Sequence, residues 1–152
     1  VDFHQMMERL VKMEDSQYSY LNTLVASNSE GIITGILVAY DGARLKELRR
    51  QFIKEAIVSF GIDYSAMDAE TEAGEFYLDS LAVSSSFRGK GIAKQLLAAA
   101  IEKARELGIP KVGLLVDKGN PRAEKLYTKV GFEYVNDTVW GGHGMRHLQY
   151  TI

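Results

Sequence analysis

The segment KVGLLVD at residues 111–117 limits the possible folds more than any other part of the sequence. It is nearly continuously apolar, which is typical of a strand whose two faces are both covered. An amphipathic helix pattern precedes it at residues 90–107 and another follows at residues 121–130. Gly108 and Gly131 stand where these helices should end. A strand between two such helices predicts a sheet layered with helices.

Hairpin patterns at both ends of the chain complete the predicted sheet. Residues 18–27 and 32–40 are β-branched and apolar, and the intervening Asn28-Ser29-Glu30-Gly31 suits a turn. Two short strands are predicted near the end of the chain, over residues 132–135 and roughly 145–152. The remaining predicted elements are a helix over 2–14, a helix over 42–60 ending at Gly61, a loop over 62–74, a strand over 75–83 and a turn over 84–89. The predicted fold class is α+β, or mixed α/β.

Composition favours one domain and excludes several kinds of chemistry. A chain of 152 residues that is 46% hydrophobic has room for one real core. The absence of cysteine excludes disulfides and thiolate catalysis. A net charge of -2 provides no basic field for nucleic acid, and no apolar run reaches the roughly 18 residues of a membrane span. No targeting motif is recognisable, so we expect a cytoplasmic protein, with a segment preceding Val1 because no initiator Met is present.

The run LAVSSSFRGKGIAK at residues 81–94 carries the most chemical information. A predicted strand enters a short turn with two glycines, and a helix begins directly afterwards. The first turn of a helix has four N–H groups without internal partners, and its dipole favours an anion there. The only charged residues between Ser80 and Ile101 are Arg88, Lys90 and Lys94, all positive. This pattern predicts a cradle for phosphate or pyrophosphate, with an ordinary helix start as the alternative.

Neither of the two standard nucleotide-binding motifs fits this turn. A P-loop needs G-x-x-x-x-G-K-[ST], and the sequence contains no such run. A dinucleotide fingerprint needs a third glycine or an alanine three residues after Gly91, where this chain has Lys94. The anion that binds here should therefore belong to another class of ligand.

Two motifs together resemble the GNAT superfamily of N-acetyltransferases. Residues 88–93 match its Q/R-x-x-G-x-G/A signature, and residues 120–132 match its segment N-x-x-A-x-x-L-Y-x-K-x-G-F. The resemblance implies a single GNAT-like domain over residues 1–152, with a mixed, mostly antiparallel central sheet and helices on both faces. The sheet would splay between the strands at about 75–83 and 111–117. The family's first strand and first helix have no counterpart, and residues 41–73 form an inserted helix and acidic loop.

This resemblance implies an acyl-CoA-dependent N-acyltransferase that moves acetyl from acetyl-CoA directly to a primary amine. The alternative is a non-catalytic acyl-CoA-binding or sensing module on the same fold. Acetyl-CoA would be a co-substrate, and no metal is expected, because His143 and His147 in a strand would lie about 13 Å apart. The implied cofactor-binding residues are Leu81, Ala82, Val83, Arg88, Gly89, Lys90, Gly91, Ile92, Ala93, Lys94, Asn120 and Tyr127.

Tyr127 matches the family's general acid for the leaving thiolate. A tyrosine pKa of about 10 against about 8.5 for a thiol makes full proton transfer uphill by roughly 2 kcal/mol, so a strengthening hydrogen bond is favoured. For the base, alternation predicts that Glu75, Tyr77, Asp79, Leu81 and Val83 share one face of their strand. Asp79 would then face the amine. The alternatives are a purely structural Asp79, Glu75 as the base, or a water relay.

The acceptor class is predicted from a run of negative charge. The charged residues from position 63 to 79 are Asp63, Asp68, Glu70, Glu72, Glu75 and Asp79. A cleft of one sign concentrates ligands of the other, so we expect a small-molecule or peptide amine acceptor that is cationic. Alternatively, cations of the preceding helix neutralise the run: Arg44, Lys46, Arg49, Arg50 and Lys54. A homodimer is the expected assembly, and neither nucleic acid nor membrane is an expected partner.

Overall fold

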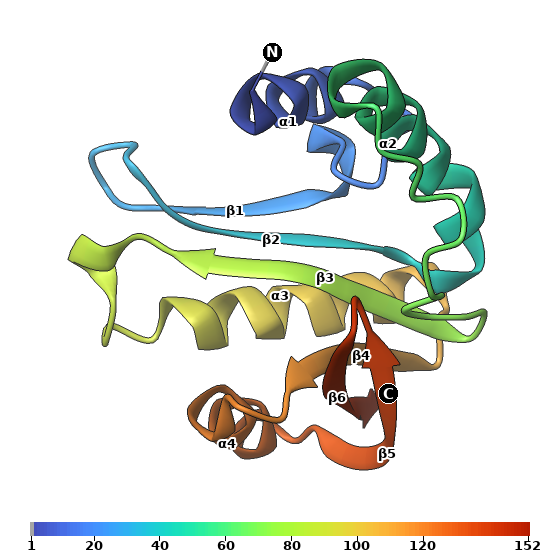
Figure 1. Ribbon diagram of the computed structural model, residues 1–152. Coiled ribbons are helices and arrows are strands. Elements are labelled where there is room, and N and C mark those ends of the chain that lie inside the picture. Colours follow the sequence, from blue (N-terminus) through green and yellow to red (C-terminus); the bar gives the residue numbers. More distant parts are fainter. Residues whose placement is uncertain (1) are drawn as a thin grey trace.

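A six-stranded mixed sheet forms the centre of the computed structural model, which describes residues 2–152 (Figure 1). The strands are β1 (Thr23–Ser27), β2 (Ile33–Asp41), β3 (Glu75–Val83), β4 (Lys111–Asp117), β5 (Glu133–Trp140) and β6 (His143–Thr151). Their order is β1-β2-β3-β4-β6-β5, and only the β3–β4 pair is parallel. The mixed, mostly antiparallel sheet is therefore confirmed. The segment expected ahead of Val1 lies outside the described residues.

Helices cover both faces of this sheet (Figure 1). α1 (Phe3–Lys12) and α2 (Leu45–Phe60) lie over one face, which we call the α2 face, and α3 (Ile92–Leu107) and α4 (Pro121–Val130) lie over the other, the α3 face. Short 3-10 turns are η1 (Tyr20–Asn22), η2 (Gly42–Arg44) and η3 (Ser85–Phe87). No helix within residues 2–152 is long and apolar enough to cross a membrane.

The helix ends predicted at Gly61, Gly108 and Asn120 agree with the structure, whereas α1 stops at Lys12 and α2 and α3 begin two or three residues later than predicted. α2 and α3 stop at Gly61 and Gly108, whose φ values of 66° and 71° belong to the left-handed region that glycine adopts without strain. α4 begins after Asn120, whose side chain accepts a hydrogen bond from the Ala123 amide. These local signals set where the helices start and stop, and so where the turns between strands and helices lie.

β4 is covered on both faces, as its apolar sequence predicts. Val112, Leu114 and Val116 lie in the main core with α3 and Phe132. Leu115 packs on the opposite side against a smaller cluster formed by Tyr40, Leu45, Leu48 and Tyr77. Burying one large apolar side chain contributes about 1.5–3 kcal/mol, so this central strand anchors both layers of helices.

Three predicted strand boundaries are wrong. β1 begins only at Thr23, because the Ser19 hydroxyl accepts a hydrogen bond from the Leu21 amide and holds Tyr20–Asn22 in a 3-10 turn. β5 and β6 are each longer than expected. They continue to the turn at Gly141 and Gly142, where φ is positive at both positions. Consecutive positive φ values suit a tight hairpin, so the glycines shape a turn inside a long ribbon.

Candidate active site

β3 and β4 separate part-way along their length. Their register pairs run only from Glu75 with Lys111 to Leu78 with Leu114. Beyond Leu78, β3 keeps its pairing with β2 alone. The sheet is therefore splayed between these two strands, as the resemblance implied.

Backbone groups of β3 point into the splay. The Ser84 amide donates to the Thr34 carbonyl at 2.9 Å, and Val83 stands opposite Gly35. In an antiparallel ladder, hydrogen-bonded and non-hydrogen-bonded pairs alternate. Val83 and Leu81 therefore direct their N–H and C=O groups away from β2, toward the side where β4 has departed. The Val83 carbonyl accepts a hydrogen bond from Arg88 Nε at 3.3 Å, and an extended ligand can pair with the other groups there.

The start of α3 has the open backbone that the predicted cradle requires. Gly91 precedes the helix with a φ of 79° and no side chain caps it, and the first turn contains no acidic residue. A Cβ built at Gly89 or Gly91 would meet nothing within 4 Å, so the backbone is open to an approaching group. The free N–H groups and the helix dipole together favour an anion at this point.

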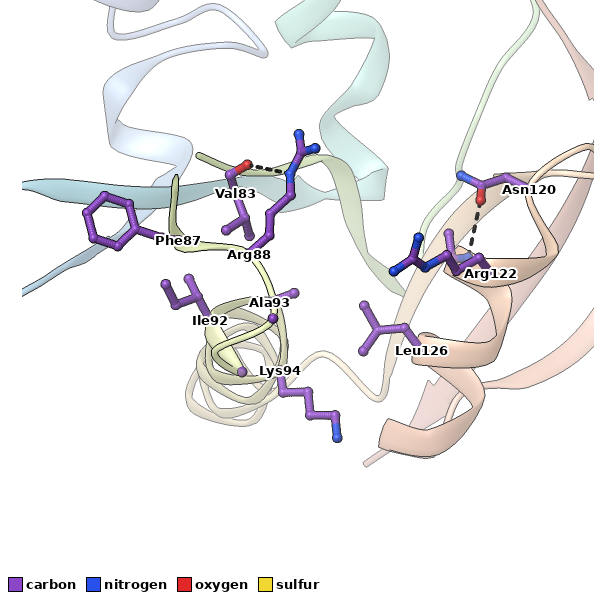
Figure 2. A pocket seen from close by; sticks show the side chains of 12 residues that line it. Val83, Phe87, Arg88, Ile92, Ala93, Lys94, Asn120, Arg122 and Leu126 are labelled. Atoms are coloured by element: carbon purple, nitrogen blue, oxygen red, sulfur yellow. Dashed lines mark hydrogen bonds between the residues drawn. The ribbon is translucent and has the colours of Figure 1, made fainter. Parts of the chain in front are cut away.

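A cleft of about 580 Å³ lies between the starts of α3 and α4 (Figure 2). Figure 2 shows Asn120, Arg122 and Leu126 on one wall and Arg88, Ala93 and Lys94 on the other. The full lining is Val83, Phe87, Arg88, Gly89, Gly91, Ile92, Ala93, Lys94, Asn120, Arg122, Ala123 and Leu126. Three of these described residues are cations and none is acidic, which suits a polyanionic ligand.

A β-bulge places Asp79 at the apex of the splay. Val38 pairs with Ser80 and Ala39 with Leu78, which leaves Asp79 as the extra residue of β3. Asp79 also follows the last β3 residue that pairs with β4. Its side chain is half-buried and faces α2, where the Tyr40 hydroxyl donates to Oδ2 at 2.7 Å and Gln17 Nε2 donates to the same oxygen at 3.0 Å. Ser80 Oγ donates to Oδ1.

The bulge corrects the predicted alternation along β3. Glu75, Tyr77 and Asp79 do share the α2 face. Leu81 instead packs against the main core on the α3 face. Val83 also belongs to that side, where it lines the cleft. The extra residue reverses the alternation of side chains along β3. Asp79 therefore faces α2, whereas Leu81 and Val83, two and four residues later, lie on the α3 face.

Glu75 is buried, and its side chain links β3 to β6 across β4. Its carboxylate accepts hydrogen bonds from Thr71 Oγ1 at 2.6 Å and Gln149 Nε2 at 2.8 Å, and lies 2.5 Å from His147 Nε2. A Cβ at Gly113 would collide with it, so glycine in β4 lets the side chain cross to β6. Burial alone would raise the pKa of Glu75, but these hydrogen bonds outweigh it and hold the pKa below its usual value. A fully engaged carboxylate suits a structural role better than that of the base.

Charge in the acidic run is partly neutralised, as the alternative interpretation held. Arg49 of α2 forms a buried ion pair with Glu70 at 2.9 Å, and Tyr77 donates to the same carboxylate. Burial raises the pKa of Glu70, and the Asp79 charge adds to the rise. Asp68 and Glu72 remain exposed. Asp79 is half-buried on this face and has no cationic partner within residues 2–152. All of its hydrogen-bond donors are neutral, so no positive charge balances its carboxylate.

Tyr127 lies on α4 next to Leu126, which lines the cleft. Its ring packs edge-on against Phe132, with 6.1 Å between ring centroids. Burial alone raises the pKa of its hydroxyl above the usual value. The hydroxyl therefore keeps its proton near neutral pH and is available as a hydrogen-bond donor.

A comparison with protein-family models matches residues 52–132 to the Acetyltransferase (GNAT) family. The chain belongs to the GNAT family. The matched region includes α2 from Phe52 onward, the β3 bulge, the start of α3 and Tyr127. This GNAT protein is thus an N-acetyltransferase that carries out acyl-CoA-dependent acetyl transfer.

Individual relatives agree with this assignment. An acetyltransferase of Agrobacterium fabrum is 33% identical over 113 residues, which are 74% of this chain and 81% of the relative. A ribosomal protein bS18 alanine N-acetyltransferase of Haemophilus ducreyi is 34% identical over 66% of this chain and 65% of the relative. A solved acetyltransferase structure superposes with a TM-score of 0.82 at 30% identity, covering all of this chain and 82% of the other.

The structure brings most of the predicted cofactor-binding residues of this GNAT enzyme to one cleft. Leu81, Ala82, Lys90 and Tyr127 do not line it. The Lys90 ammonium instead lies over the Phe87 ring, 5.3 Å from its centroid. Sequence reasoning missed four lining residues, namely Phe87, Arg122, Ala123 and Leu126. The last three lie inside the second motif, and their helical spacing from Asn120 was the signal that could have identified them.

His143 and His147 both lie on β6, which begins at His143, two residues before the predicted strand. His147 contacts Glu75, whereas His143 lies 4.0 Å from Asp117. Within residues 2–152, no three His, Asp or Glu side chains are grouped closely enough to hold a metal ion.

Proposed function

We propose that this enzyme transfers an acetyl group from acetyl-CoA directly to a primary amine of a small cationic molecule or a peptide. The observation that carries the proposal is the layout of β3. Its open backbone edge and the cradle at α3 serve the acyl donor on one side, and Asp79 at the bulge serves the acceptor on the other. No enzyme nucleophile is needed for direct transfer, which agrees with a sequence that lacks cysteine.

The chain's residues fit acetyl-CoA as a co-substrate. The amides at the start of α3, with Arg88, Lys94 and Arg122 around them, would hold its phosphates. The backbone of Leu81 and Val83 would pair with its extended arm. When bound, acetyl-CoA supplies an activated thioester whose acetyl carbon accepts the amine.

Asp79 would take a proton from the acceptor. An amine with a pKa near 10.4 is almost wholly protonated at pH 7, and freeing it costs about 4.6 kcal/mol. A carboxylate without a cationic partner binds the ammonium form and takes one proton from it, directly or through a water, which leaves a free amine that can attack. As the N–C bond forms, a second N–H bond breaks, and that proton ends on the departing thiolate.

Tyr127 would assist departure of the thiolate. Its hydroxyl is buried enough to remain protonated, so it stabilises the developing negative charge on sulfur by donating a hydrogen bond. The sulfur leaves with the electron pair of the broken C–S bond. The role of Tyr127 extends the family resemblance, whereas that of Asp79 rests on its place at the β3 bulge.

A cationic acceptor is favoured by the charge that remains on the α2 face. Asp79 is unmatched, and Asp68 and Glu72 are exposed on the loop that leads to β3. Glu70 does not contribute to attracting a cationic acceptor, because it is buried and paired with Arg49. Exposed carboxylates attract a cation over several ångströms and are screened by salt.

Salt should therefore lower kcat/KM steeply for a polyamine such as spermidine. In an Asp68→Asn/Glu72→Gln double variant, kcat/KM at low salt should be lower and its salt dependence flatter. The matched control is Glu106→Gln/Glu133→Gln, which removes the same charge from exposed positions on α3 and β5 and should follow the wild type. Identical salt curves in all three proteins, or a preference for anionic acceptors, would contradict steering.

Release of free thiol from acetyl-CoA, measured over a panel of amines, tests the proposed activity as a whole. The panel contains spermidine, an aminoglycoside, a lysine-containing peptide and an anionic amine. We expect amine-dependent thiol release that is fastest with the cationic members. Acetyl-CoA binding without turnover on any amine would favour the sensing module instead.

A further inference from the structure

The Asp79 carboxylate is held by two donors that converge on the same oxygen. The Tyr40 hydroxyl and Gln17 Nε2 both donate to Oδ2, at 2.7 and 3.0 Å. Both donor residues are 2% exposed, whereas Asp79 is half-buried. Oδ1 receives one hydrogen bond, from the exposed Ser80. One oxygen is therefore fixed from the protein side, and the other remains on the accessible side.

From this arrangement we infer that Tyr40 and Gln17 are positioning residues that aim Asp79 at the acceptor amine. The inference rests on the proposed function, in which Asp79 binds and deprotonates that amine. A carboxylate on a bulge has freedom to rotate about its side-chain bonds. Two donors on Oδ2 remove that freedom and keep the lone pairs of Oδ1 available to the substrate nitrogen.

The Gln17 amide supports a positioning role over a merely structural one. Its Oε1 is buried and has no hydrogen-bond partner among the described residues. A buried unpaired acceptor is unfavourable, and a structural glutamine is expected to satisfy both ends of its amide. Reversing the amide would place its carbonyl oxygen against the charged Oδ2. The Asp79 carboxylate thus fixes the amide orientation, even though Oε1 is left without a donor.

Both positioning residues come from rigid surroundings. The backbone N–H of Gln17 donates to the Leu48 carbonyl of α2 at 3.2 Å, which fixes the segment between α1 and β1. The Tyr40 ring packs edge-on against Tyr77, with 5.8 Å between centroids. A general base is effective only when its side chain has a fixed position. These contacts fix Gln17 and Tyr40, which in turn fix the Asp79 carboxylate.

Tyr77 offers a matched control within the same cluster. It is as deeply buried as Tyr40, at 3% against 2% exposure, and it also donates its hydroxyl to a carboxylate. That carboxylate is Glu70 instead of Asp79. Removing either hydroxyl deletes one hydrogen bond to a carboxylate from the same packing cluster. A difference in catalysis between the two variants therefore reports on Asp79 rather than on stability.

The test compares Tyr40→Phe, Gln17→Met and Tyr77→Phe under saturating acetyl-CoA, with the fastest cationic amine of the panel as acceptor. We expect kcat to fall about 10- to 100-fold in the first two and to stay within about twofold of wild type in Tyr77→Phe. KM for acetyl-CoA should not change in any of them. Thermal melts confirm that all three fold.

A double-mutant cycle with Asp79→Asn separates this inference from the proposed function. If the hydroxyl acts through Asp79, adding Tyr40→Phe to Asp79→Asn should cause no further loss of kcat. An equal loss in Tyr77→Phe, or full additivity in the cycle, would overturn the positioning role. Wild-type kcat in Asp79→Asn would refute the proposed base itself. A large loss in Asp79→Asn with none in Tyr40→Phe and Gln17→Met would refute the positioning role alone.

Discussion

Gly91→Asp is expected to abolish CoA binding. Gly91 precedes α3, and the space beyond its Cα is open, so an aspartate side chain fits without a clash. Its carboxylate would then accept hydrogen bonds from the same amides that are meant for phosphate, and its charge would repel the ligand. Because the backbone amides are then occupied and the new charge repels phosphate, CoA affinity should fall by more than about a hundredfold. Isothermal titration calorimetry with CoA measures the effect.

Gly31→Asp is the matched control for this prediction. Gly31 has the same φ of 79° and equally open space, but it lies in the β1–β2 turn. Backbone strain and added charge are therefore similar, and CoA affinity should be unchanged. If folded Gly91→Asp binds CoA as well as the Gly31→Asp control, the phosphates do not bind at the start of α3.

Tyr127→Phe is expected to lower kcat by about 10²–10⁴-fold, the usual contribution of a general acid or base. The substitution keeps the ring that packs against Phe132 and removes only the hydroxyl. Tyr127 is absent from the lining of the cleft that would hold the phosphates, so CoA affinity should change little. Steady-state kinetics and calorimetry on the same preparation separate the two effects.

The control for Tyr127→Phe is Tyr150→Phe. The Tyr150 ring contacts the same Phe132, with 5.8 Å between centroids, but it comes from β6. It should leave kcat unchanged while removing a hydroxyl from the same aromatic cluster. Equal kinetics in wild type and Tyr127→Phe would make Tyr127 an aromatic residue of the core and nothing more.

Local signals explain which parts of the fold were predictable. Gly61, Gly108 and the Asn120-Pro121 pair mark helix ends through interactions with their own neighbours, so sequence alone places them. The cradle at Gly89 and Gly91 is likewise a strand–turn–helix feature within one short run. Each of these features depends on residues a few positions apart.

The bulge at Asp79 depends on partners that sequence patterns do not reveal. It exists because β2 and β3 pair with a shifted register, and a period of two applied along β3 assigns Leu81 to the wrong face. The donors to Asp79 are equally hidden, since Gln17 and Tyr40 lie 62 and 39 residues away. Arg49 was one of five candidate cations, and only the packing of α2 selects it for Glu70.

The destination of the acetyl group in a single turnover tests direct transfer most directly. Enzyme, acetyl-CoA and the fastest cationic amine are mixed, quenched and examined by mass spectrometry for the amine and for the intact protein. We predict one N-acetylated amine for each CoA released and an unmodified protein. The Gly91→Asp variant should yield neither acetylated amine nor free CoA. Acetyl-CoA that binds but donates its acetyl group to no amine, or an acetyl group retained on the protein as an intermediate, would contradict the proposed function.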